Sequence, residues 1–344
     1  MKIRHRQGAY PIIFTTLEVA REAVPAESFV VTDSHLSEKY VHHFRPDLPT
    51  LVVPAGETSK SMGQFDRILN WLARNGMRRH QHLVAFGGGM IGDLAGFAAS
   101  TYMRGVPLIQ IPTTLLSMVD SSVGGKVGID LPSGKNLVGA FKAPTTVYIC
   151  PEVLQTLPGR EFTAGVAEVL KYGFIMDEPL ITSLSKLPLM PGDGRLTEII
   201  RTCISHKATI VERDEMDTSG LRATLNFGHT VGHAIETLQD FQGLLHGEAV
   251  AVGMATEAQI SESLGFAPPL TRTAITATLS AHHLPIAIPD ELSAKDLVQA
   301  MLSDKKSTGD GLALSLVGGI GTCKLRTGVN VDDVIRSIDE LKRD

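Results

Sequence analysis

The chain has 344 residues, of which 43% are hydrophobic, 20% charged and 5% aromatic, and its formal net charge is −5. This composition is typical of a folded protein with an aliphatic core, and the length favours two domains. The negative charge argues against a general nucleic-acid binder, and no run reaches the roughly 18 apolar residues of a membrane helix.

The cysteines and the first residues of the chain indicate its compartment. Cys150, Cys203 and Cys323 lie far apart and without CxxC spacing, so neither a disulfide framework nor a thiolate zinc site is indicated. The opening MKIRHRQGAY lacks the apolar core of a signal peptide. We therefore expect a cytoplasmic protein with no membrane or nucleic-acid partner.

Up to about residue 150, short apolar runs alternate with helical patterns. The runs are SFVVTD (28–33), TLVVPAG (50–56), HLVAFGGG (82–89), VPLIQIPTT (106–114) and TTVYIC (145–150). Strands that are apolar on both faces, separated by amphipathic segments such as MGQFDRILNWLARNG, predict a Rossmann-like, mainly parallel sheet. We assign residues 1–151 to this α/β domain.

The pattern changes after Pro151 to long helical segments such as REFTAGVAEVLKYGFI, RLTEIIRTCISHKATIVERDE and GEAVAVGMATEAQISESLG. Residues 152–344 are therefore predicted to form a mostly α-helical domain. Two late runs, LALSLV and TCKLRT, predict a β-hairpin at about 312–327 that can rejoin the first domain.

The first chemical signal is GGGMIGD, where Gly87, Gly89 and Gly92 match GxGxxG between a strand and a helical pattern. Such a turn lets backbone amides approach a pyrophosphate at a helix N-terminus. A plain tight turn is the alternative, but this context favours a nucleotide. No acidic residue ends the next strand, so Asp33 is the candidate ribose partner, with an exposed turn residue as an equal alternative.

The second signal is the tract at 111–136, where polar residues follow a strand among glycines. GGKV lacks the spacing and the Ser or Thr of a Walker A loop, which excludes that motif. Polar groups after a strand lie at the ligand-binding edge of α/β sheets, so we favour a site over a solvated loop. The residues are Thr113, Thr114, Asp120, Lys126, Lys135 and Asn136.

The third signal is LNFGHTVGHAIE, where His229 and His233 are four apart and share a helical face. HEXXH is absent because Thr230 follows the first histidine. His246 begins another apolar helix, and Glu168 lies in an earlier one. A carboxylate with two imidazoles would form a catalytic metal site with an open position. The spacing leaves open which three bind, and two hydrogen-bonded structural histidines are the competing interpretation.

Taken in order, these motifs resemble 3-dehydroquinate synthase, a family of the sugar phosphate cyclase group. They are GGGMIGDLAGFAASTYMRG, IPTTLLSMVDSSVGGKVGID, GKNLVGAF, AGVAEVLKYG, LNFGHTVGHAIE and LHGEAVAVGM, and the resemblance runs from about residue 28 to DKK at 304–306. Cyclases that make inosose or valiolone products share the framework but differ at 120–136, where DSSVGGK and GKN are similar to the dehydroquinate type. Val127 stands where we expect a Thr, which leaves open the hydroxyl contact there.

The resemblance implies a reaction that uses NAD without net redox change. The substrate would be 3-deoxy-D-arabino-heptulosonate 7-phosphate. Transient oxidation of its C5 hydroxyl would acidify the neighbouring C–H, so that phosphate leaves. Return of the hydride, ring opening and an internal aldol addition would then give 3-dehydroquinate.

The resemblance also implies a role for each matching residue. Glu168, His229 and His246 would bind one Zn²⁺ or Co²⁺, and Glu248 would either orient a ligand or begin a helix. The implied catalytic residues are Lys171, His233, Asn226, Asp120 and Lys126. The implied substrate-binding residues are Arg104, Asn136, Lys207, Arg222, Lys305 and Lys306. The implied NAD-binding residues are Asp33, Gly56, Glu57, Lys60, Gly89, Gly92, Asp93, Thr113, Thr114, Lys126, Lys135 and Thr156. A homodimer is also implied.

Two other functions compete with this interpretation, besides another cyclase of the group. A metal-dependent NAD polyol dehydrogenase of the glycerol dehydrogenase type would share the layout, but a neutral polyol would not need so many cationic positions. A non-catalytic protein that kept the fold is disfavoured because Glu168, His229, His246 and Lys171 are all present.

Overall fold

The computed structural model describes residues 1–6, 8–40, 45–303 and 311–342. The chain divides into two units. Unit 1 comprises Met1–Leu157 and Gly194–Met216, and unit 2 comprises Pro158–Asp193 and Asp217–Asp344. Of the helices that the structure describes, none is both long and apolar enough to cross a membrane.

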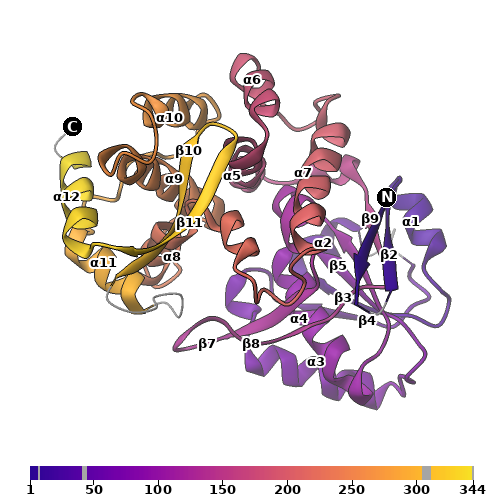
Figure 1. Cartoon of the computed structure of the whole chain (residues 1–344). Helices are drawn as coiled ribbons and strands as arrows, with labels where there is room; N and C mark the ends of the chain where they lie inside the picture. Colours follow the sequence, from indigo (N-terminus) through magenta and orange to yellow (C-terminus); the bar gives the residue numbers. More distant parts are fainter. Residues whose placement is uncertain (7, 41–44, 304–310, 343–344) are drawn as a thin grey trace. The chain divides into compact units, whose positions relative to one another are not determined.

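Unit 1 is built on a seven-stranded sheet in the order β1-β2-β9-β6-β5-β3-β4 (Figure 1). The strands are β1 (Lys2–His5), β2 (Gly8–Phe14), β3 (Phe29–Asp33), β4 (Thr50–Val53), β5 (Leu83–Gly87), β6 (Leu108–Pro112) and β9 (Thr146–Ile149). All neighbouring pairs are parallel except β1 with β2. The predicted Rossmann-like, mainly parallel sheet is therefore confirmed, with each of the five predicted strands in it.

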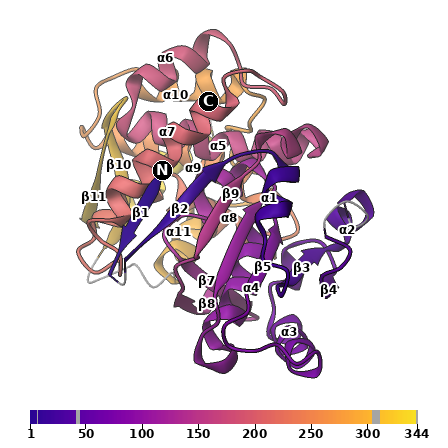
Figure 2. The same cartoon turned by 90° about the vertical axis from the view of Figure 1, so that its right-hand side faces the viewer.

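The first two strands were not predicted from the sequence. β1 pairs with β2 in antiparallel fashion, from Lys2 opposite Pro11 to His5 opposite Gly8, and β2 continues the sheet beside β9 (Figure 2). Only Ile3, Tyr10 and Ile12 are buried in this pair, so the apolar signal is weak. Pairing with β9, more than 130 residues away along the chain, supplies the missing support.

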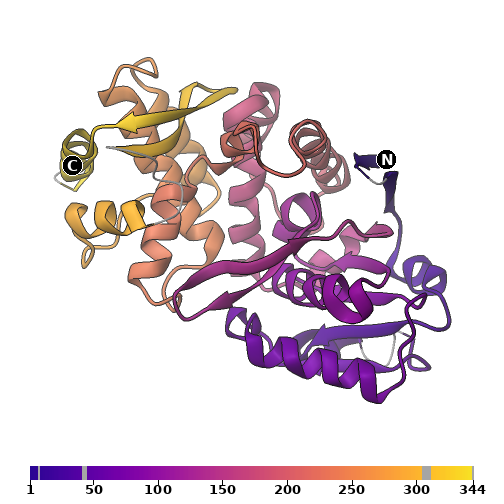
Figure 3. The same ribbon diagram turned by 60° about the horizontal axis from the view of Figure 1, so that its bottom comes forward.

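Helices cover the sheet of unit 1. They are α1 (Leu17–Ala23), α2 (Ser34–Tyr40), α3 (Met62–Arg74), α4 (Gly89–Thr101) and α7 (Leu196–Val211), with short turns η1 (Glu57–Ser59), η2 (Tyr102–Arg104), η3 (Ser117–Ser121) and η4 (Pro151–Thr156). A separate antiparallel hairpin, β7 (Lys126–Leu131) with β8 (Gly134–Phe141), packs on α4 (Figure 3). Val127 is 6% exposed and belongs to the core between them, so an apolar side chain suits this position.

The sequence pattern assigned residues 194–216 to the helical domain, but α7 packs in unit 1. The guanidinium of Arg201 lies 4.1 Å from the ring centroid of Phe14 in β2. Lys207 forms an ion pair of 2.9 Å with Asp120 of η3. Helical periodicity identifies the helix but carries no information about which neighbour covers its apolar face, and this explains the error.

Unit 2 is mostly helical. Its helices are α5 (Gly159–Met176), α6 (Glu178–Lys186), α8 (His229–Leu238), α9 (His246–Ser263), α10 (Thr271–Ala281), α11 (Ala294–Ser303) and α12 (Val331–Leu341), with the turn η5 (Leu221–Asn226). Helix α9 is buried along most of its length and contacts α5, α8, α10 and α12. The predicted helical character of this part of the chain is therefore confirmed.

The late hairpin forms as predicted, from β10 (Leu312–Gly319) and β11 (Thr322–Val329). The hairpin belongs to unit 2 and contacts α9 (Figure 1), and its packing on the first domain stays a prediction. Leu312, Leu314 and Leu316 are buried in one apolar cluster with residues of α8, α9, α11 and α12. The hairpin thus completes the core of unit 2.

Helices α8 and α9 pack unusually closely at Gly253. A Cβ atom there would overlap the carbonyl oxygen of Gly228 and lie 2.8 Å from its carbonyl carbon. We expect Gly253→Ala to lower the free energy of unfolding by about 1–3 kcal/mol or more, since backbone atoms have no room to move aside. Urea unfolding measures this change.

Gly159→Ala is the matched control, because the added methyl meets no atom within 4 Å at the start of α5. It should leave stability unchanged or raise it by up to about 1 kcal/mol. A Gly253→Ala protein as stable as this control would contradict the packing described here.

Candidate functional site

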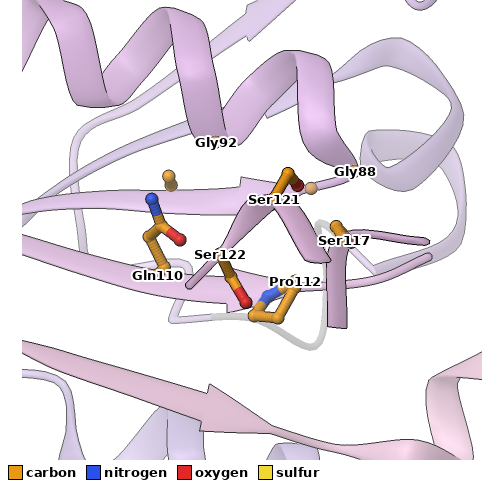
Figure 4. Close-up of a pocket in the computed structure, with 9 residues that line it drawn as sticks. Gly88, Gly92, Gln110, Pro112, Ser117, Ser121 and Ser122 are labelled. Carbon is orange, nitrogen blue, oxygen red and sulfur yellow. The ribbon is translucent and has the colours of Figure 1, made fainter. Parts of the chain in front are cut away.

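In unit 1 the glycine-rich segment begins helix α4 at the carboxyl end of β5. Gly88 is the N-cap residue and no side chain caps the helix, so the first amides of α4 are available to an anion. A small pocket, whose volume of about 170 Å³ includes open solvent, adjoins this end, between the ends of β5 and β6 and the turn η3. Figure 4 shows that Gln110 of β6 and three serines, Ser117, Ser121 and Ser122, line it together with Gly88 and Gly92.

Two of the predicted cofactor residues lie beside helix α2. The Asp33 carboxylate accepts a hydrogen bond of 3.0 Å from the Leu36 amide, so it caps α2. Thr156 hydrogen-bonds through its hydroxyl to Tyr40 at 2.8 Å. Thr113 and Thr114 follow β6, and the Thr113 amide donates to the Gly87 carbonyl, which ties this segment to the glycine-rich turn.

Lys60 is 4% exposed and connects three other residues that were predicted to bind cofactor or substrate. Its Nζ lies 2.7 Å from Asp93 and 3.6 Å from Glu57, and it donates a 2.5 Å hydrogen bond to Asn136. Burial by itself would lower the pKa of Lys60, but the carboxylates of Asp93 and Glu57 outweigh it and raise the pKa above its usual range. Lys60 is therefore charged and holds α4, the 56–60 turn and β8 together.

The other predicted residues of unit 1 are spread over three segments. Asp120 lies in η3 and its backbone carbonyl also accepts a hydrogen bond of 2.7 Å from Lys207. Lys126 and Lys135 lie at the starts of β7 and β8. Arg104 is exposed and has a left-handed backbone with φ of 62°, next to Met103 with φ of 49°. Two successive non-glycine residues in this region indicate local strain.

In unit 2 the three helices α5, α8 and α9 bring Glu168, His229 and His246 together. One ligand atom from each lies within 4.8 Å of the others. The Glu168 carboxylate is 3.4 Å from His229 Nε2 and 3.7 Å from His246 Nε2. These are distances over which one divalent cation can bind a carboxylate oxygen and two imidazole nitrogens.

Both imidazoles direct Nε2 toward Glu168 because Nδ1 is engaged elsewhere. His229 Nδ1 lies 3.2 Å from the Phe227 carbonyl, which can only accept, so Nδ1 carries the proton. His246 Nδ1 lies 3.3 Å from the carboxylate of Glu236, a residue that is 3% exposed. Such outer partners fix the tautomer of metal-binding histidines. Burial first, and then the positive charge of Lys171, hold the pKa of His229 well below its usual value, so its ring is neutral.

Whether a cation fits between Glu168, His229 and His246 depends on the surroundings of the Glu168 carboxylate. Glu168 is 1% exposed, and among the described residues neither of its oxygens accepts a hydrogen bond of standard geometry. It forms an ion pair with Lys171, which is equally buried. A carboxylate with unfilled acceptor positions facing two imidazole nitrogens is the donor set that zinc and similar cations bind.

A second group shares His246 with the first. His233, Glu236 and His246 also place ligand atoms within 4.8 Å of one another, and the rings of His229 and His233 are 5.4 Å apart. Glu236 was missed from the sequence, although its spacing of three from His233 puts it on the same helical face. Arg222 and Asn226 lie in η5, just before α8, with Arg222 buried. The predicted Lys305 and Lys306 lie outside the described residues.

The arrangement in each unit defines a class of protein. A solved 2-deoxy-scyllo-inosose synthase, in complex with carbaglucose-6-phosphate, NAD⁺ and Co²⁺, matches with a TM-score of 0.87, 27% identity and coverage of 99% of both chains. A probable glycerol dehydrogenase from Sinorhizobium meliloti matches in fold alone, with a TM-score of 0.62, 16% identity and 96% coverage of both. The fold is that of the sugar phosphate cyclases, which a dehydrogenase also shares.

Comparisons at the sequence level are more specific. The family model for the 3-dehydroquinate synthase N-terminal region matches residues 50–164, and that for the C-terminal region matches 165–307. A 3-dehydroquinate synthase from Geobacter metallireducens is 46% identical over 82% of this chain and 79% of its own. Another, from Geotalea uraniireducens, is 40% identical over 96% of each. The chain belongs to the 3-dehydroquinate synthase family.

The two overlapping groups lead to a prediction about metal content. If the ion binds Glu168, His229 and His246, His229→Ala should weaken zinc binding by more than the roughly 10–100-fold that loss of an outer partner causes, because a ligand is removed. His233→Ala should retain the ion. Metal analysis after dialysis, with circular dichroism as a control for folding, measures both. If His229→Ala kept the metal and His233→Ala lost it, the ion would instead be held by His233, Glu236 and His246.

Proposed function

We propose that the chain is a 3-dehydroquinate synthase, a carbon–oxygen lyase of aromatic amino-acid biosynthesis. It would convert 3-deoxy-D-arabino-heptulosonate 7-phosphate to 3-dehydroquinate and phosphate. The observation that carries this proposal is the Glu168, His229 and His246 cluster in a chain that aligns with a 3-dehydroquinate synthase over 96% of its length.

Unit 2 would hold the divalent metal and unit 1 would hold NAD. The metal would bind Glu168, His229 and His246, and when bound it polarises a substrate hydroxyl. NAD would lie at the uncapped start of α4 and, when bound, accepts and later returns a hydride. The presence of NAD⁺ and Co²⁺ in the inosose synthase of the same fold supports both assignments.

The cations of unit 2 suit a substrate that carries a phosphate and a carboxylate. Lys171 is 1% exposed and Arg222 is 5% exposed, so their charges act in a medium of low polarity. Arg222 can bind an anion in bidentate fashion, and Lys171 can supply a point charge and also balances Glu168. Buried cations of this kind suit an anionic substrate better than a neutral polyol, which favours the cyclase over a dehydrogenase.

His233 would transfer protons, because an imidazole gains and loses one near neutral pH. It is one turn beyond His229 on α8, and their rings meet edge to face. Asn226 would orient substrate hydroxyls. Residues of unit 1 would share this work. The hydroxyls of the substrate would be oriented by Asp120 and Asn136, and its anionic groups would be bound by the cations Arg104, Lys126 and Lys207.

The compartment and the oligomeric state are also part of the proposal. None of the three cysteines forms a disulfide among the described residues, which supports a cytoplasmic protein. The homodimer stays a prediction from the family resemblance.

Incubation with the heptulosonate phosphate, Zn²⁺ or Co²⁺ and a catalytic amount of NAD tests the function. Phosphate and 3-dehydroquinate should form in equal amounts with no lasting rise in NADH absorbance, because the hydride returns to the substrate. The control is protein stripped of metal, which should release no phosphate.

Two other outcomes would contradict the proposal. Steady accumulation of NADH from glycerol or another simple polyol, without phosphate release from the heptulosonate, would identify a dehydrogenase. Turnover of sedoheptulose 7-phosphate or glucose 6-phosphate in place of the heptulosonate would identify another cyclase.

A further inference from the structure

Glu257 is a carboxylate of helix α9 that none of the roles above uses. It is 0% exposed, although α9 around it is apolar. Its two oxygens accept hydrogen bonds from backbone amides of α8, from Gly228 at 2.7 Å and from Val231 at 3.3 Å. A carboxylate at this end of a helix is favoured by the helix dipole and by charge-assisted hydrogen bonds.

Helix α8 needs this contact because it has no cap of its own. Its N-cap residue is Gly228, with φ of 80°, so the usual Ser, Thr, Asp or Asn side chain is missing. None of these could replace the glycine, because a Cβ there would lie 2.5 Å from Met254 Cγ and 2.6 Å from the Val250 carbonyl oxygen. Glu257 reaches across from α9 and takes the place of that cap.

The capped turn carries the first proposed metal ligand. His229 is the first residue of α8 and follows Gly228 directly. Its ring is also anchored to this turn, through Nδ1 and the Phe227 carbonyl. The position of His229 Nε2, 3.4 Å from Glu168, thus depends on how the 227–231 backbone is held.

We propose that Glu257 is a positioning residue for the metal site: its carboxylate holds the first turn of α8 so that His229 presents Nε2 beside Glu168 and His246. This inference rests on the proposed metal site. Loss of the contact would let the 227–231 turn shift, which weakens metal binding even though every ligand remains.

Glu262 provides a matched control on the same helix. Its carboxylate accepts a 2.6 Å hydrogen bond from the Arg272 amide in the first turn of α10, whose N-cap residue also lacks a side-chain cap. α10 carries none of the proposed ligands. Glu257→Gln and Glu262→Gln therefore change the same kind of contact. Of the two capped helices, α8 and α10, only α8 bears a proposed metal ligand.

The experiment measures zinc affinity by competition with a chelator, the visible spectrum of the Co²⁺-loaded protein and the urea midpoint of each variant. Glu257→Gln should weaken zinc affinity by roughly 10–100-fold, as loss of an outer partner does, and should alter the Co²⁺ bands. Glu262→Gln should change only the urea midpoint. Unchanged affinity and an unchanged spectrum in Glu257→Gln would overturn the inference.

If Glu257→Gln does not fold, Glu257→Asp takes its place, since it keeps the charge but is too short to reach both amides. It should show the same weaker binding, and unchanged affinity would again overturn the inference. A wild-type protein that binds no zinc would overturn the metal site and the role of Glu257 together. A wild-type protein that binds zinc but turns over no substrate would overturn only the proposed function.

Discussion

The close packing of three helices is the constraint on which unit 2 depends. Gly247 and Gly253 of α9 face the backbones of α5 and α8, and a Cβ at either would overlap a carbonyl oxygen, that of Ala164 or that of Gly228. A salt bridge reinforces the first contact, since Arg160 at the start of α5 binds both oxygens of Glu248 at 2.7 Å. Because α9 approaches both neighbours this closely, side chains from three separate helices can meet at one point.

That meeting point contains more charge than a protein interior usually tolerates. Two carboxylates, Glu168 and Glu236, and the ammonium of Lys171 are each at most 3% exposed. Burying such groups is unfavourable unless they are paired, and each has a partner of suitable chemistry: Lys171 for Glu168, and His246 for Glu236. A bound cation would add positive charge where Glu168 has unfilled acceptor positions. The polar core of unit 2 therefore has the composition that the proposed cation site requires.

Much of this could be predicted from the sequence, and the exceptions share a physical cause. The buried parallel strands and the His229 and His233 spacing are local patterns, and local patterns predict local structure well. The pairing of β2 with β9, the placement of α7 and the cap that Glu257 provides depend on contacts between separate segments of the chain. Glu257 in particular is one acidic residue in an apolar helix, and nothing in its neighbours along the chain indicates the helix it caps. Likewise, the sequence marks Lys60 as a turn residue, whereas its buried ion pair with Asp93 becomes visible only in the fold.

The central claim is that a single divalent cation binds where α5, α8 and α9 meet. Anomalous diffraction at the zinc absorption edge, from crystals of the zinc-loaded protein, locates such an ion directly. We predict one strong peak bounded by Glu168 and by Nε2 of His229 and His246, with the Glu236 carboxylate still on Nδ1 of His246. A peak enclosed by His233, Glu236 and His246, or no ordered peak in unit 2, would contradict this account.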